Sequence, residues 1–148
     1  MLELIARPDQ WELLRGGADI PTAVEEFIRW VSPIHNMCRV SARDHELGGV
    51  TIRKGQQLVL LYGSGNRDPA HFKDPDNFDI TRHPNDHLAF GVGTHFCLGA
   101  GLARLEIRVF FEELVQRVRS MQLLSEPVEM PNAFVFGLRS AHVQFLPA

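Results

Sequence analysis

Apolar residues recur with helical spacing in three stretches of the chain. The clearest stretch follows Gly101, where one helical face collects Ala103, Ile107, Phe110, Phe111, Leu114, Val115 and Val118. The other face is largely polar, with Arg104, Arg108, Glu112, Gln116 and Arg119. We expect the apolar face to pack into a core. Shorter helices are expected from Pro8 and from Pro21, and the second should end at Ser32-Pro33, because the residue before a proline avoids the helical conformation.

Between these helices the pattern changes to short apolar runs separated by turn residues. Strands are expected at 38–42, 47, 50–52 and 58–62, with turns at Gly48-Gly49 and Lys54-Gly55. Residues 66–85 are rich in Asp, Pro and Asn without a period, which predicts a long ordered loop. Residues 133–146 alternate around Gly137 and predict a closing hairpin. The expected class is mainly α with small antiparallel β sheets.

Composition narrows the class of protein. With 45% hydrophobic and 22% charged residues, the chain can form a packed core, and a net charge of -3 does not favour nucleic acid as a partner. No apolar run approaches the roughly 20 residues of a membrane span. The N-terminus is too short and too charged for a signal peptide. Cys38 and Cys97 are too few for a disulfide framework and fit a reducing compartment, so a cytoplasmic location is expected.

The segment with the strongest chemical signal, FGVGTHFCLG, runs from Phe90 to Gly99 into the long predicted helix. Its first two glycines allow a tight backbone path. That path brings Cys97 to a helix start, where free N–H groups and the helix dipole favour a negative charge. The thiolate is the form of cysteine that binds metals. Gly99 lets the backbone approach a group bound to the sulfur. The segment therefore predicts a cysteine ligand.

Phe90, Gly93, Cys97 and Gly99 match the pattern Phe-x-x-Gly-x-x-x-Cys-x-Gly at every fixed position. This pattern resembles the haem-binding signature of the cytochrome P450 family, and the resemblance covers essentially the whole chain. It implies that residues 1–148 are the C-terminal haem-binding portion of the α+β P450 fold, as an incomplete domain. The N-terminal helical part is expected to be absent. Its oxygen-activating helix would be absent with it, so no catalytic residue is assigned.

The same resemblance implies roles for further residues. Glu26 and Arg29 fit the family's Glu-x-x-Arg helix, and Arg82 fits the arginine that completes this structural triad. Arg39 and His95 stand where family members contact the haem propionates, and a guanidinium suits a carboxylate. The predicted cofactor-binding set comprises Cys97, which is also the metal ligand, with His95, Arg39, Phe90, Gly91 and Gly99.

Two arginines on the polar face of the long predicted helix allow two interpretations. Arg104 and Arg108 could simply form a solvated face. In the alternative interpretation they form the surface on which an acidic electron-donor protein docks. The resemblance implies a ferredoxin-type or other electron donor as the partner.

The activity implied by the resemblance is that of a haem b thiolate monooxygenase. Such an enzyme inserts one oxygen atom from O2 into a C–H bond of a hydrophobic substrate, and the thiolate favours O–O cleavage. Residues 32–39 and 132–138 are similar to actinobacterial members that oxidise sterol side chains and fatty acids. The 148-residue chain alone is not expected to be competent, because the distal half of the pocket is missing.

Other functions remain open from the residues themselves. The chain could be a non-catalytic haem-binding module from a truncated gene, or a family member that isomerises or dehydrates without a redox partner. A zinc-stabilised interaction domain is a further alternative, although His83, His87, His95 and Cys97 lack paired ligand spacing. Cys97 could also be a plain buried cysteine. A dinucleotide loop is excluded because Phe96 stands where its third glycine belongs.

Overall fold

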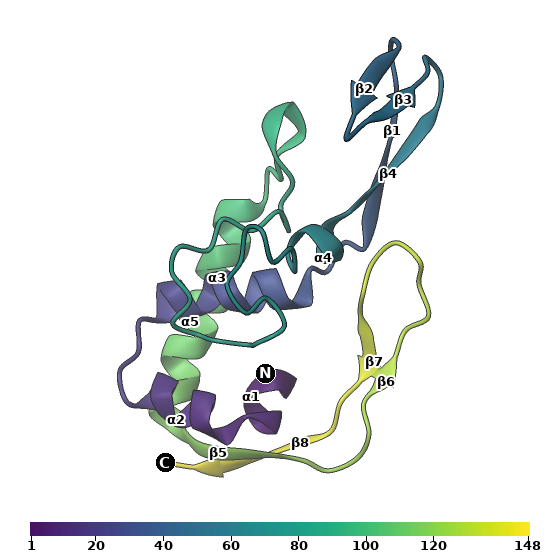
Figure 1. Cartoon of the computed structure of the whole chain (residues 1–148). Coiled ribbons are helices and arrows are strands. Elements are labelled where there is room, and N and C mark those ends of the chain that lie inside the picture. The colour runs from purple at the N-terminus through teal and green to yellow at the C-terminus, as the bar shows by residue number, and fades with distance from the viewer.

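The computed structural model describes all 148 residues, with elements labelled in Figure 1. The helices are α1 (Leu2–Ala6), α2 (Pro8–Arg15), α3 (Ile20–Val31), α4 (Tyr62–Gly65), the 3-10 helix η1 (Gly93–His95) and α5 (Ala100–Arg117). The strands are β1 (Asn36–Val40), β2 (His45–Leu47), β3 (Val50–Ile52), β4 (Gln57–Leu61), β5 (Val118–Leu123), β6 (Val128–Glu129), β7 (Leu138–Ser140) and β8 (Val143–Pro147). They form four antiparallel pairs, β1–β4, β2–β3, β5–β8 and β6–β7, which confirms the predicted helices with small antiparallel sheets.

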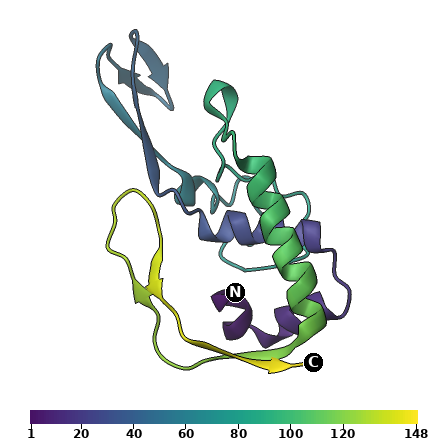
Figure 2. The same ribbon diagram turned by 180° about the vertical axis from the view of Figure 1, so that it is seen from behind.

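Helix α3 is fixed at both ends by local chemistry. The carboxylate of Asp19 accepts a hydrogen bond from the backbone N–H of Thr22 and so caps the helix start. Ser32 closes the helix in a left-handed conformation with φ 42°, directly before Pro33. The predicted end of this helix is therefore confirmed. Seen from behind in Figure 2, α5 crosses α3 and carries the chain from the cysteine segment toward the C-terminus.

The core lies where α1, α2, α3 and the C-terminal half of α5 meet. Phe27 of α3 is its centre, with its ring centroid 6.0 Å from that of Phe78 in the long loop and 4.6 Å from that of Phe111 in α5. Around them are buried Leu4, Trp11, Leu14, Ala23, Ile80, Leu114 and Val118. Only 20 of the 148 residues are buried, because many apolar side chains lie on outer faces.

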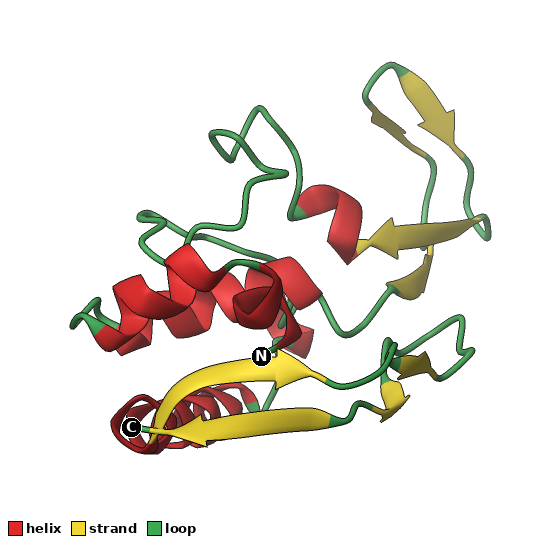
Figure 3. Ribbon diagram, turned by 90° about the horizontal axis from the view of Figure 1, so that it is seen from below, coloured by secondary structure: helices red, strands yellow, loops and turns green.

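The long helix ends earlier than its apolar pattern predicts. Val118 and Arg119 belong to β5, not to α5, because Val118 pairs with Pro147 across the β5–β8 ribbon. Figure 3 shows this ribbon of two long strands along one side of the helices, ending at the C-terminus. Phe111 is buried on α5, whereas Phe110 is 46% exposed. The predicted core role of Phe110 and the helical placement of residues 118 and 119 were wrong.

Three smaller expectations also differ from the structure. The predicted closing hairpin about Gly137 is wrong, because β5 pairs with β8 around an inner β6–β7 pair. Gly137 lies on the returning side, where its carbonyl accepts a hydrogen bond from Met130 N–H. The strand expected to reach Tyr62 stops one residue earlier, since Tyr62 begins α4. Helix α1 was not expected, because its five residues are too few for a periodic signal.

None of the helices combines the length and apolar character that a membrane span requires. The longest, α5, has 18 residues and carries charged side chains along its length.

Candidate functional site

The cysteine loop, residues 90–99, is shaped by backbone bonds and two left-handed glycines. Gly91 and Gly93 have φ values of 72° and 78°, which side chains with a Cβ rarely adopt. The loop closes where Cys97 N–H donates to the carbonyl of Phe90 at 2.9 Å. Cys97 is exposed and stands two residues before Gly99, the N-cap of α5. The sulfur therefore lies near free N–H groups and the positive end of an 18-residue helix, which favours an anionic ligand atom.

A cavity of about 580 Å³ opens beside this loop and gathers residues from three parts of the sequence, 33–39, Tyr62 and 89–97. Its lining comprises Pro33, Ile34, Met37, Arg39, Tyr62, Ala89, Phe90, Gly91, His95 and Cys97. Five of the six predicted cofactor-binding residues are among them. Gly99 is the exception, but a Cβ built there would lie 3.9 Å from the Cys97 sulfur, so this glycine borders the ligand atom.

The lining matches the chemistry of a haem. A thiol on one wall can bind iron, and apolar side chains make up most of the remaining surface. Arg39 and His95 on the same cavity offer donors for two acidic side groups. Arg39 is exposed, and its guanidinium donates to the carbonyl of its neighbour Cys38 at 2.9 Å. Its side chain therefore has no competing ion pair.

Sequence reasoning missed Tyr62 and Ala89 as lining residues. The apolar pattern places Tyr62 at the end of a strand, yet its hydroxyl lies 3.6 Å from the position that a Cβ on Gly91 would occupy. No motif marks these residues, because their place in the cavity depends on where β1, α4 and the cysteine loop meet. Met37 falls within the segment 32–39, which the family resemblance already singled out.

The predicted structural triad forms a buried polar centre between α3 and the long loop. Glu26 and Arg29 have no exposed side-chain surface and meet through two bonds of 2.7 and 2.8 Å. Arg82 joins Glu26 at 3.2 Å. Asn85 and the backbone N–H of Asp79 also donate to this carboxylate, so it accepts five hydrogen bonds in all. Asn85 was missed, because nothing in its sequence neighbourhood predicts a contact with α3.

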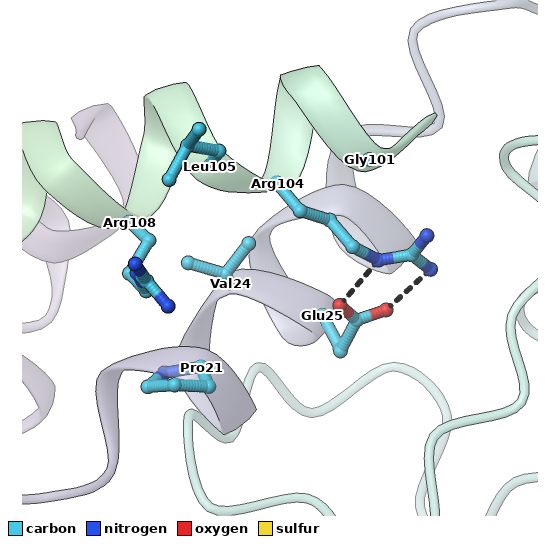
Figure 4. A pocket seen from close by; sticks show the side chains of 7 residues that line it. All are labelled: Pro21, Val24, Glu25, Gly101, Arg104, Leu105 and Arg108. Carbon is cyan, nitrogen blue, oxygen red and sulfur yellow. Dashed lines mark hydrogen bonds and ion pairs between the residues drawn. The ribbon is translucent and has the colours of Figure 1, made fainter. Parts of the chain in front are cut away.

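Arg104 and Arg108 line a groove of about 260 Å³ between α3 and the first turns of α5 (Figure 4). Arg104 makes two hydrogen bonds to Glu25, of 2.7 and 2.9 Å, which are drawn as dashed lines in Figure 4. Arg104 thus joins α5 to α3, although its side chain is still 37% exposed. The Arg108 side chain is 45% exposed, and its Nε lies 3.4 Å from Oε1 of Glu112 on the same helix.

His87 completes the cluster that begins with Arg104 and Glu25. Its Nε2 lies 3.1 Å from a Glu25 carboxylate oxygen, and its side chain is only 2% exposed. Burial lowers the pKa of His87 below its ordinary value, although Glu25 opposes this. Burial raises the pKa of Glu25, but Arg104 and His87 outweigh that effect, so the pKa ends below its ordinary value. The hydrogen bond to Glu25 raises the pKa of Arg104.

No group of three or more His, Cys, Asp or Glu side chains is placed to share a metal ion. Cys38 and Cys97 are both free thiols. The zinc alternative therefore has no ligand cluster in this fold, while a single cysteine beside an apolar cavity remains suited to haem iron.

Known proteins resemble this chain in sequence and in fold. Residues 20–146 match the family model described as Cytochrome P450. The chain is 43% identical over 150 residues to a steroid C26-monooxygenase of Mycobacterium tuberculosis (strain CDC 1551 / Oshkosh), covering 99% of this chain and 40% of that protein. It is 40% identical over 148 residues to linalool 8-monooxygenase of Pseudomonas putida, covering 99% of this chain and 36% of that protein. A solved structure of P450BioI with an acyl carrier protein ligated to hexadec-9Z-enoic acid superposes with a TM-score of 0.93 and 46% identity, covering 98% of this chain and 38% of that one.

The chain belongs to the cytochrome P450 family, and its fold is part of the P450 fold. The predicted family and fold are confirmed, and haem b is the cofactor of this family. The chain spans about 40% of the length of the curated relatives it matches.

Proposed function

We propose that this chain is the part of a haem-thiolate monooxygenase that holds haem b through Cys97. The observation that carries the proposal is the cavity in which the Cys97 thiol, at the start of α5, lies together with Arg39 and His95. Haem held by a cysteine thiolate supplies dioxygen activation, and the thiolate favours cleavage of the O–O bond. The whole enzyme would insert one oxygen atom into a C–H bond of a hydrophobic substrate.

The residues of this chain contribute binding and orientation. The backbone bond from Cys97 N–H to Phe90 fixes the direction of the sulfur. Gly91 and Gly93 provide the left-handed turns that the loop requires. Arg39 and His95 are proposed to pair with the two propionates, which would set the rotation of the ring within its plane. Glu26, Arg29 and Arg82 keep α3 and the long loop in place beneath the site.

An electron-donor protein is the proposed partner. Insertion of one atom of O2 into a C–H bond, with reduction of the other atom to water, would consume two electrons, which a donor protein would supply. The groove between α3 and α5 supports a docking place for an acidic partner, since it presents Arg108 and one edge of Arg104. Arg104 contributes less free charge than the sequence suggested, because Glu25 neutralises it. A ferredoxin fits this description, and the cytoplasmic location stays a prediction.

The substrate is proposed to be a sterol or a fatty acid. Segment 33–36 borders the cavity and is joined to the tip of the β6–β7 hairpin by backbone bonds from His35 to Phe134 and from Phe136 to Pro33. Pro33 and Ile34 line the cavity, and Phe134, Val135 and Phe136 on the hairpin are apolar, which suits a hydrophobic ligand. Support also comes from the relatives, one of which is named for steroid C26 oxidation and another of which was solved with a fatty acyl carrier protein.

We further propose that the 148-residue chain does not turn over substrate alone. Val92 and Leu98 are 78% and 103% exposed, and the outer face of α5 exposes Leu102, Val109 and Phe110. Apolar surface of this extent is characteristic of a covered interface. In the whole enzyme, other parts of the chain would cover these residues and close the cavity against water.

Product analysis tests the proposal. The complete gene product that carries this sequence would be incubated with a ferredoxin, its reductase, NADPH, and a sterol, a fatty acid or a monoterpene alcohol. We expect a hydroxylated sterol or fatty acid whose new oxygen derives from labelled O2. The 148-residue chain, treated identically, should give no product. Haem binding without any oxygenated product from the complete protein would instead identify a non-catalytic haem-binding module.

A further inference from the structure

The cluster of Glu25, His87 and Arg104 lies directly behind the cysteine loop and is not explained by ligand binding. His87 is almost completely buried, at 2% side-chain exposure, whereas the other histidines of the chain are exposed. A buried imidazole must satisfy both ring nitrogens or lose stability. Both nitrogens of His87 have partners, and each partner belongs to a different part of the site.

The hydrogen bonds define which nitrogen carries the proton. Nδ1 accepts the backbone N–H of Ala89 at 3.3 Å, so it is unprotonated. The proton therefore sits on Nε2, which donates to Glu25 at 3.1 Å. A neutral imidazole in this one tautomer links the backbone at the entrance of the cysteine loop to a carboxylate on α3.

Glu25 also connects His87 to α5. The same carboxylate accepts both hydrogen bonds of Arg104, at 2.7 and 2.9 Å. The Arg104 guanidinium carbon then lies 4.7 Å from the ring centroid of Phe90, within the range of a cation–π contact. The His87 ring centroid lies 5.8 Å from the same Phe90 centroid. Phe90 therefore contacts both Arg104 and His87.

Phe90 connects this cluster to the sulfur. Its carbonyl accepts the N–H of Cys97 at 2.9 Å, the bond that closes the cysteine loop. Ala89, bonded to His87, is the residue immediately before it. A shift of residues 89 and 90 must move Cys97, because the loop between them is short and is set by two left-handed glycines.

We propose that His87 is a positioning residue for the cysteine ligand, tying the entrance of the cysteine loop to the Glu25–Arg104 ion pair. The inference rests on the proposed role of Cys97 as the haem ligand. His87 touches neither the cavity nor the sulfur, and it acts through Ala89, Phe90 and Glu25. Its loss should allow the loop to relax, so that the thiolate is more readily protonated or displaced from iron.

Three substitutions of His87, made in the complete gene product, distinguish the effect of its hydrogen bond to Ala89 from that of its hydrogen bond to Glu25. His87→Phe keeps an aromatic ring and removes both bonds. His87→Asn keeps an acceptor near the Nδ1 position for Ala89 but does not reach Glu25. His87→Gln keeps a donor near the Nε2 position for Glu25 but loses the Ala89 bond. His71→Phe is the matched control, because His71 is exposed and lies in the long loop, away from the cysteine segment.

The readout is the absorption spectrum of the reduced, carbon monoxide-treated protein, which distinguishes thiolate-ligated haem from haem that has lost the thiolate. His87→Phe should raise the fraction without thiolate about fivefold or more, as expected for losing at least one buried hydrogen bond. Asn and Gln should each restore part of the difference, and His71→Phe should match the unmodified protein.

The other outcomes would contradict either the proposed function or the positioning role of His87. An unmodified protein without a thiolate spectrum would refute the proposed function itself. A normal thiolate spectrum in the unmodified protein and equally in His87→Phe would refute the positioning role alone. Equal losses in the Phe, Asn and Gln variants, with equal losses of thermal stability, would also refute it, because packing and not the two bonds would then be responsible.

Discussion

Glu26 and Leu98 belong to neighbouring parts of this chain and have opposite surroundings. Glu26 is a charged side chain with no exposed surface and five hydrogen-bond donors around its carboxylate. Leu98, next to the cysteine, is an apolar side chain whose surface is fully exposed. The region around Glu26 thus satisfies its polar groups from within this chain. The region around the cysteine exposes the surfaces on which a cofactor and further protein would pack.

This difference indicates which interactions the chain can make by itself. The triad region joins α3 to the long loop through side chains contributed entirely by residues 26–85. The cysteine loop is held from behind by the His87 cluster, while its front faces the cavity. Substitutions in the first region should therefore change the stability of the chain, and substitutions in the second should chiefly change ligand binding.

The largest effect is expected from breaking the buried ion pair. Glu26→Gln leaves Arg29 and Arg82 without a carboxylate partner, which should lower the free energy of unfolding by about 3–5 kcal/mol. The matched exposed change is Glu113→Gln, which breaks an ion pair with Arg117 on the surface of α5 and should cost about 0.5 kcal/mol or less. Urea unfolding measures the free energy of unfolding of both variants. Similar losses of stability would contradict the importance assigned to the buried ion pair.

Neighbouring phenylalanines on α5 give a second contrast. Phe111 is 5% exposed and packs on Phe27, so Phe111→Ala should cost about 3–4 kcal/mol. Phe110 is 46% exposed, so Phe110→Ala should cost less than about 1 kcal/mol in this chain. Thermal unfolding compares them. A large loss for Phe110 would mean that the outer face of α5 is already covered, which would contradict the exposed interface proposed for it.

Replacing glycine by alanine should lower the stability of the protein in the cysteine loop and raise it in α5. Gly91 has a φ of 72°, and alanine there should cost about 1–2 kcal/mol of strain and weaken haem binding. Gly101 is the second residue of α5, where an added Cβ would meet no neighbouring atom, so Gly101→Ala should stabilise the protein by about 0.5 kcal/mol or less. Haem titration and thermal unfolding of the two variants test this, and a stabilised Gly91→Ala would contradict the turn.

Much of the local structure could be predicted from the sequence, as could the place of the candidate ligand Cys97 just before α5. The start and end of α3 follow from proline and capping residues, and the position of Cys97 follows from the spacing of Phe90, Gly93 and Gly99. The partners of Arg104 could not be predicted, because Glu25 lies 79 positions away and no periodicity links them. The end of α5 at Arg117 was missed because β5–β8 pairing overrides a helical pattern that continues through Val118.

The smallest effect concerns pH and acts through His87. Its pKa in the folded protein is lowered from the ordinary value of 6.5, so the unfolded chain binds a proton first as the pH falls. The stability contributed by neutral His87 is complete above that value and decreases below it. Glu25, whose folded pKa is also lowered, adds a loss in the same direction at lower pH. His87→Gln should flatten the fall in stability as the pH decreases below about 6.5, measured by urea unfolding at a series of pH values, and an unchanged slope there would contradict a buried neutral imidazole.

The ligand assignment itself is tested most directly by the spectrum of the reduced protein under carbon monoxide. The complete gene product and its Cys38→Ser variant should both give the red-shifted Soret band of a thiolate-ligated haem. Cys97→Ser should lose that band while the protein remains folded. A red-shifted band that survives in Cys97→Ser would show that another residue binds the iron, and the assignment of Cys97 as the haem ligand would be wrong.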